Sequence, residues 1–588
     1  MAGSGRHGSG LSVLVVAVLV SLVLCLWEVF AFRRADPYTT DGSYYQGLAE
    51  NLASHRGYVF DFKPHTRYPP GFPVVLAVGG IVVGHDYTSY VRLMPLFGFA
   101  GLLSMLVLVA KEDRETVAAA ACLLLASSPQ FFRSATQDVL SDLPFFAVSG
   151  AALLAISRPR PKALLAAPLV VTAVMIRSAG IALVAAVLAT LAWNWRELPP
   201  RTRRVLGLVA AAGVVAEIAW LAWSLGHAAP DWPGEPMDSY VRQLALKDPR
   251  EPGLGAATAL DIVWRVRDGL STLAARSVEI ATHLPWIAPI WFSPLVLFPI
   301  VLVGLGVATS IARRHSILLA WYVAAYCALY ALWPFDEGGR FVVPIFPLVV
   351  MFGVRGAIVC FAAVESRPRV ASFVPPVLAV LAAGACWSAW RDPRTGMQER
   401  TAVLTLIVLA ITAFVLSRVR RSGIFATVHR LAPAAITVVV LVIVGAGILT
   451  QNVIASSNRA AGATFADRSS AMSVAAWLVA RPDVDPVMAQ QTAVFHRLTG
   501  RRTVSFPTVD DGDLVSRTVR LNDVAYMIVS NDETAQYYRP SERARFEALR
   551  AAEPDCCELA FANGGYRVYR IATRVPLTRV RSVLRQPY

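Results

Sequence analysis

Charged residues are scarce in this sequence. Only 16% of its 588 residues are Asp, Glu, Lys or Arg, whereas 55% are hydrophobic. A soluble protein cannot bury so much apolar surface, so the composition indicates a polytopic α-helical membrane protein. The net charge of +15 is then expected to lie mostly in cytoplasmic loops, and we expect no nucleic-acid partner.

Cysteine patterns and nucleotide-binding motifs are also lacking. The seven cysteines have no spacing typical of a zinc site, and the adjacent pair Cys556 and Cys557 is poorly placed to bridge. No Walker loop or glycine-rich dinucleotide fingerprint occurs, so we expect no energy from ATP and no certain cofactor. No internal repeat relates two halves of the chain, as it does in many transporters.

Long apolar runs make up most of the chain. Because a spanning helix needs about 20 apolar residues, the runs predict about thirteen transmembrane helices with uncertain ends. The candidate spans lie near 11–31, 89–110, 115–129, 138–157, 162–176, 178–195, 204–226, 289–312, 315–333, 341–362, 371–390, 401–417 and 432–450.

The basic loops predict the orientation of these spans. Residues 11–31 are followed by Phe32-Arg33-Arg34 rather than by a cleavage site, so we expect a retained first helix. If the short run 70–84 only dips into the outer leaflet, all five basic loops fall on the cytoplasmic side. The predicted location is the plasma (inner) membrane, with a cytoplasmic N-terminus.

Two domains are expected. Residues 1–450 would form the membrane domain, with a first outer loop at 32–88 and a large outer loop at 227–288 that contains an amphipathic helix near 262–280 on the bilayer surface. Residues 451–588 would form an extracytoplasmic α/β domain, because 487–489, 524–529 and 566–571 have strand patterns and 470–479 and 541–552 have helix patterns. Arginines in the tail suggest contact with membrane lipids, although a solvated tail is an equal alternative.

Polar residues that interrupt the apolar runs gather on the predicted outer face. A charge at a helix mouth is costly unless it is paired or faces a wet cavity, so the default interpretation is functional; snorkelling or loop exposure is the alternative. Arginine matches phosphate oxygens with its planar fork, and a nearby carboxylate can take a proton from a hydroxyl. The candidates are Asp41, Arg67, Asp138, Asp142, Arg177, Asp336, Glu337 and Arg340.

Several of these residues lie in motifs that resemble the GT-C glycosyltransferases. The similarity is to bacterial relatives of protein O-mannosyltransferases and of aminoarabinose transferases (glycosyltransferase families 39 and 83), and it covers roughly residues 11–360. The motifs are Asp41 after the first helix, Tyr68-Pro69-Pro70-Gly71-Phe72-Pro73, Val139-Leu140-Ser141-Asp142-Leu143-Pro144 and Gly339-Arg340-Phe341-Val342-Val343-Pro344.

The resemblance implies an inverting transfer of a sugar from a polyprenyl phosphate to an acceptor hydroxyl. Asp41 would be the general base. Asp142, or else Asp138, would orient the acceptor or the sugar. The arginines, Arg67 and Arg340 among them, would hold the phosphate. Apart from the resemblance, Tyr44, Tyr45 and Tyr68 are candidates to stack on the sugar, with packing against helices as an equal alternative.

Two departures from the family concern a metal. Gly42 follows Asp41, so the mannosyltransferase-type Asp-Glu pair is missing, and Thr66-Arg67-Tyr68 stands where the aminoarabinose branch has an acid. A divalent metal therefore stays open, and His65 is a candidate ligand or an ordinary loop histidine.

Two other classes of function compete with the enzyme: a flippase or transporter for lipid-linked sugars, and a non-enzymatic cell-envelope assembly protein. The sequence identifies neither the sugar nor the acceptor, which would be a glycan, a lipid or a protein.

Overall fold

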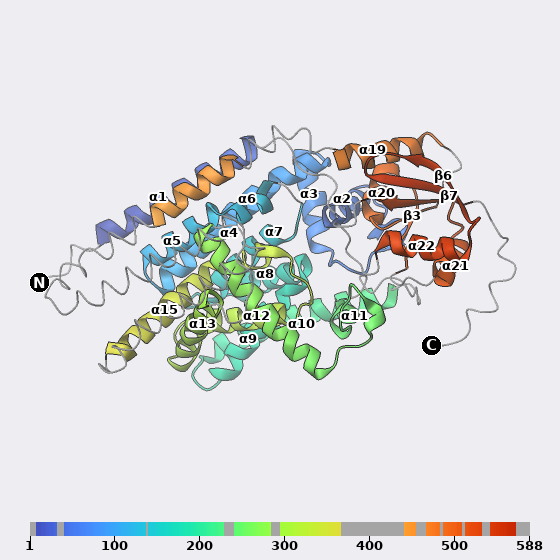
Figure 1. The fold of residues 1–588 in the computed structure, drawn as a ribbon. Helices are drawn as coiled ribbons and strands as arrows, with labels where there is room; N and C mark the ends of the chain where they lie inside the picture. The colour runs from blue at the N-terminus through green and yellow to red at the C-terminus, as the bar shows by residue number, and fades with distance from the viewer. Residues whose placement is uncertain are drawn as a thin grey trace, which may run out of the picture.

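The computed structural model describes ten segments of the chain: residues 7–31, 40–136, 139–227, 240–283, 294–365, 440–453, 466–481, 486–507, 512–531 and 541–571. Figure 1 shows a large helical part and, at one end of it, a five-stranded sheet with its own helices.

The helical part is built from helices that, apart from the short and more polar one at Pro129–Thr136, are apolar and rich in Ala, Leu and Val. They are α1 (His7–Ala31), α3 (Gly71–Val83), α4 (Tyr87–Glu112), α5 (Glu115–Ala126), α6 (Pro129–Thr136), α7 (Asp142–Ile156), α8 (Ala163–Ile176), α9 (Ile181–Trp193), α10 (Pro200–His227), α13 (Pro294–Ala312), α14 (Ile317–Ala331) and α15 (Phe346–Glu365). One continuous hydrophobic core runs through this part, and it includes Phe72, Phe145 and Tyr326.

The predicted count of thirteen spans stays a prediction. Among the described residues, α4 and α10 are long and apolar enough to cross a membrane, and the bent pair α5–α6 would be a third span. Most other apolar helices have only 10–17 residues, about 15–26 Å at 1.5 Å per residue, which is short of the hydrocarbon core. The candidate spans 371–390 and 401–417 lie outside the described residues.

Two short runs differ from simple spans. The run 70–84 forms the 13-residue helix α3, and its expected dip into the outer leaflet stays a prediction. The run near 115–129 continues into α6, and the two helices meet at 59°; the expected turn near 130–137 is therefore largely helical.

The first outer interval is more ordered than a loop. It contains helix α2 (Thr40–Ala53) and a hairpin of β1 (Val59–Phe60) and β2 (Lys63–Pro64). Tyr45, Leu48 and Ala49 on α2 are buried, so one face of an otherwise polar segment packs inward. Asp41 thus lies in the first turn of a helix, where the helix dipole favours a carboxylate.

The large outer loop holds α11 (Tyr240–Ala245) and α12 (Ala259–Thr282). Helix α12 covers the predicted amphipathic stretch. It begins with a capping box in which Thr258 and Asp261 each bond the other's backbone N–H, an arrangement that stabilises a helix start. Leu260, Val263 and Trp264 remain exposed. They lie at the start of α12, and the expected position of this helix on the bilayer surface stays a prediction.

The C-terminal sheet has the strand order β4-β3-β5-β7-β6. Strands β3 (Val487–Ala489), β4 (Thr503–Val504) and β5 (Tyr526–Ser530) are parallel, and β6 (Cys557–Ala562) and β7 (Tyr566–Ile571) are antiparallel. Helices α19 (Ala466–Val479), α20 (Thr492–Thr499), α21 (Gly512–Leu521) and α22 (Glu542–Ala552) cover it. The three predicted strands and both predicted helices form within a few residues of their expected ends.

Candidate functional site

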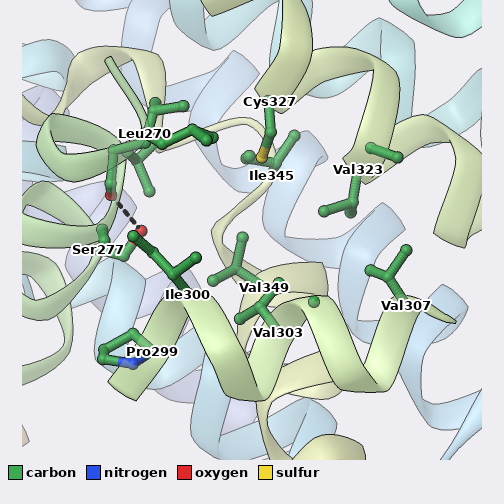
Figure 2. A pocket seen from close by; sticks show the side chains of 15 residues that line it. Leu270, Ser277, Pro299, Ile300, Val303, Val307, Val323, Cys327, Ile345 and Val349 are labelled. Carbon is green, nitrogen blue, oxygen red and sulfur yellow. Dashed lines mark hydrogen bonds between the residues drawn. The ribbon is translucent and has the colours of Figure 1, made fainter. Parts of the chain in front are cut away.

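Two cavities in the described part of the chain are large enough to hold a ligand. The first, of about 220 Å³, lies between α12, α13, α14 and α15. Its side chains are nearly all aliphatic, and the Ser277 hydroxyl is already bonded to the Leu273 carbonyl at 2.7 Å (Figure 2). Cys327 is the remaining polar group among its lining residues. This cavity offers neither a base nor a charge for acid–base or phosphate chemistry.

The second cavity, of about 240 Å³, contains most of the predicted residues. It lies where α2, the turn before α3, the start of α7, the end of α8, α10, α11 and the segment after α14 meet. Asp41, Arg67, Tyr68, Arg177, Glu337 and Arg340 all line it. Residues separated by up to 299 positions therefore converge on one site.

Asp41 accepts a hydrogen bond from the Tyr68 hydroxyl, with 2.7 Å between that oxygen and Asp41 Oδ1. Its Oδ2 lies 3.5 Å from Arg340 Nη1. Burial by itself would raise the pKa of Asp41, but Arg340, Arg67 and the Tyr68 hydrogen bond together lower it below the usual value. Asp41 is therefore ionised at neutral pH and is able to accept a proton.

Arg340 lies on η4 (Gly338–Phe341), a short 3-10 helix after α14. Its Nη2 donates to Glu337 Oε2 at 2.6 Å, while Nη1 faces Asp41. The Nε of Arg340 is buried and has no hydrogen-bond partner among the described residues. An unmet donor of this kind is costly unless a ligand supplies an acceptor.

Asp142 differs from its expected position. It is 1% exposed and is not among the cavity-lining residues; its Oδ1 pairs instead with Arg177 Nη1 at 2.9 Å. Arg177 also donates to the Tyr330 hydroxyl and to Ser141 Oγ, both at 3.0 Å. Asp142 therefore lies behind the arginine, where it sets the arginine's position; its expected role in orienting the acceptor or the sugar stays a prediction. Asp138 lies outside the described residues.

Arg67 is held beside the site by its neighbours. Its guanidinium carbon lies 4.8 Å from the centre of the Tyr68 ring, and its Nε is buried with no described hydrogen-bond partner. The backbone before it is fixed by α10, because Ser224 Oγ donates to the Thr66 carbonyl at 2.7 Å. Like Arg340, Arg67 thus lines the cavity and has a buried Nε without a described hydrogen-bond partner.

The structure gives little support for a metal at His65. Nε2 of His65 accepts from the Tyr68 backbone N–H at 3.1 Å, so the nitrogen nearest the site is already used. Burial and the Arg67 charge lower the pKa of His65 to about 3, so the ring is neutral. Among the described residues no cluster of three His, Cys, Asp or Glu side chains could hold a metal ion.

Sequence reasoning missed several residues of the cavity. Tyr240 on α11 and Glu217 on α10 both line it, and Glu217 Oε2 is buried without a described hydrogen-bond partner. Tyr45, which was among the aromatic candidates, also lines the cavity; it donates to Ser141 Oγ at 3.2 Å and so connects α2 to the start of α7. A carboxylate in the apolar run of α10 was the one signal that pointed to Glu217.

One wall of the cavity is apolar and open. It is formed by exposed side chains of α9, α10 and α11, namely Ile181, Leu221, Leu225 and Val241. The arginines and Asp41 stand on other elements, so the cavity has a charged part and an aliphatic flank. This combination suits an amphiphile with a charged head and a long apolar chain.

Neither protein-family models nor curated proteins match the chain. Among solved structures, the chain is similar to ArnT from Cupriavidus metallidurans bound to undecaprenyl phosphate. The TM-score is 0.49 at 14% identity, and the match covers 96% of this chain and 98% of that one. It is also similar to the archaeal oligosaccharyltransferase AglB from Archaeoglobus fulgidus in complex with an inhibitory peptide and a dolichol-phosphate. There the TM-score is 0.48 at 14% identity, over 98% of this chain and 76% of that one.

Proposed function

We propose that this protein is a membrane glycosyltransferase that moves a sugar from a polyprenyl phosphate to an acceptor hydroxyl at the outer face of the membrane. The observation that carries the proposal is the convergence of one ionised carboxylate, Asp41, with Arg67, Arg177 and Arg340 in a single cavity. The apolar flank formed by α9, α10 and α11 supports a lipid-linked donor rather than a soluble one.

The proposed reaction is a single displacement. The acceptor oxygen attacks the anomeric carbon, the bond between that carbon and the phosphate oxygen breaks, and the bonding electrons leave with the lipid phosphate. Asp41 takes the proton from the attacking hydroxyl. Attack from the side opposite the phosphate inverts the anomeric centre.

The arginines stabilise the departing phosphate. Arg67 and Arg340 line the cavity, where their positive charges would neutralise the phosphate. Fixed donors aimed at developing negative charge, in a site shielded from water, are the largest common source of rate acceleration. Arg177 is fixed by Asp142, Ser141 and Tyr330, which keeps its charge in place before the donor arrives.

A flippase is the rival class. The cavity charges gather at one set of helix ends and the loops beside them, rather than along a path through the helical part, and this favours an enzyme over translocation. The assay is transfer by the purified full-length protein from radiolabelled polyprenyl-phosphate sugars in detergent. Turnover without a membrane supports the enzyme, whereas translocation in vesicles without bond cleavage supports the flippase.

The variant that tests the base is Asp41→Asn. We expect it to fold and to lose transfer by at least about 100-fold, the usual scale for general base catalysis. Asp86→Asn is the matched control, because Asp86 caps α4 outside the cavity and Asn caps a helix equally well. Normal transfer by Asp41→Asn at normal expression would refute the assignment.

A further inference from the structure

The C-terminal domain contacts the helix that carries Asp41. Helix α20 packs on α2, and Ala493 of α20 shares a small buried cluster with Leu48 of α2 and Phe60 of the hairpin. Figure 1 shows α20 and α2 next to each other at the junction of the sheet and the helical part. We call this set, with the polar bonds described next, the docking contact.

A bidentate ion pair forms one half of the polar bonds. Arg497 Nη2 donates to Glu50 Oε1 at 2.7 Å, and Nη1 donates to Oε2 of the same carboxylate. Both side chains are about 30% exposed, so the pair is partly desolvated. Gln46 Nε2 also donates to Glu50 Oε1 at 3.0 Å. The carboxylate is therefore fixed from both sides, and the paired geometry is specific.

Asp61 forms the other half. It lies in the turn between β1 and β2, and its two oxygens accept from the backbone N–H of Thr503 at 3.1 and 3.2 Å. His496 Nδ1 lies 3.1 Å from Asp61 Oδ1. The hairpin packs on α2 through the Tyr44 and Phe60 rings, whose centres are 4.5 Å apart. The C-terminal domain thus contacts α2 in two ways: directly through α20, and indirectly through the β1–β2 hairpin.

The arginines of the site are held by other parts of the chain. Arg177 is fixed by residues before α7 and on α14, Arg340 by Glu337 in its own segment, and the backbone before Arg67 by α10. Of the predicted charged residues, only Asp41 stands on α2. A shift of α2 therefore moves the base directly, whereas each arginine keeps the contacts named here to elements other than α2.

We infer that the docking contact is a positioning device for Asp41, with Glu50 and Arg497 as positioning residues. Glu50 is nine residues from Asp41 on one helix, or about 14 Å at 1.5 Å per residue, so a fixed end at Glu50 limits how α2 tilts at Asp41. This inference rests on the proposed role of Asp41 as base. A displacement of about 1 Å is enough to lower a rate by about 100-fold.

The test is charge reversal in the full-length protein. We expect Arg497→Glu to lower kcat by 10- to 100-fold and to leave the KM for the polyprenyl-phosphate sugar within about threefold. Amide hydrogen exchange should rise in α2 and stay unchanged in α10, which reports the loss of docking independently of activity. The double variant Glu50→Arg/Arg497→Glu restores the pair in reverse, and both kcat and exchange should return toward wild type.

Arg543→Glu is the control, because Arg543 pairs with Glu547 on an exposed face of α22; it should change neither kcat nor amide exchange in α2.

Raised exchange in α2 with unchanged kcat overturns the inference, as does a change in KM without a change in kcat. If Asp41→Asn is inactive while Arg497→Glu keeps its kcat, only the positioning role fails. If Asp41→Asn retains transfer, the assignment of the base fails, and the role of the docking contact fails with it.

Discussion

Removing the Tyr68 hydroxyl tests the state of Asp41 without removing either residue. The Tyr68→Phe variant keeps the ring that packs against Tyr45 and beneath Arg67, but it loses the hydrogen bond to Asp41 Oδ1. A hydrogen bond to a charged group contributes about 1.5–3 kcal/mol. Loss of this bond therefore removes a stabilisation of that size from the charged form of Asp41 and raises the pKa of its carboxyl group.

The sign follows from the role of the base. Asp41 must be deprotonated to accept the proton, so transfer is lost as pH falls through its pKa. The hydrogen bond from Tyr68 is one of the interactions that lower that pKa, so its removal raises the pKa. We expect the acidic limb of the activity profile to move to higher pH, with little change at neutral pH.

The measurement is kcat from about pH 3 to pH 8, a range that spans ordinary carboxylate titration. Tyr45→Phe is the matched control, because the Tyr45 hydroxyl donates to Ser141 and not to Asp41. A profile in Tyr68→Phe that coincides with wild type would refute the reasoning. An equal shift in Tyr45→Phe would also refute it, since the effect would not depend on the bond to Asp41.

Two further predictions concern stability. Asp142→Asn leaves the Arg177 charge without its buried partner, and we expect the free energy of unfolding to fall by about 3 kcal/mol. The double variant Asp142→Asn/Arg177→Met should recover much of the Tm without recovering transfer. An unchanged Tm in Asp142→Asn would contradict the pairing. Gly71→Ala would place a Cβ 2.5 Å from the Met175 backbone, so α3 must shift and the Tm should fall. Gly207→Ala, which meets nothing within 4 Å, should be neutral or stabilising by up to about 1 kcal/mol.

The class of the protein and the face that carries its polar residues could be predicted from sequence. A shortage of charge and a surplus of apolar runs are properties of composition, so no contact needs to be known to recognise them. The strand 566–571 was equally accessible, because its alternating pattern is local and its ends coincide with β7.

Helix α2 is an element that the sequence did not predict. Its segment contains Gly42 and Gly47 and has many polar residues, a composition typical of a loop. It is helical because Tyr45, Leu48 and Ala49 are buried against other elements, and tertiary packing overrides weak propensity. The same packing places Asp41 in the first turn of a helix.

The partners of the charged residues were decided by tertiary structure alone. Sequence reasoning grouped Asp41, Asp142 and the arginines by the face they share, since sidedness follows from counting helices and basic loops. It could not show that Asp142 turns toward Arg177, away from the cavity, or that Arg497 reaches Glu50 across 447 positions. Composition and periodicity are local properties of the chain, whereas a partner depends on how distant helices pack, and that is determined only when the whole core forms.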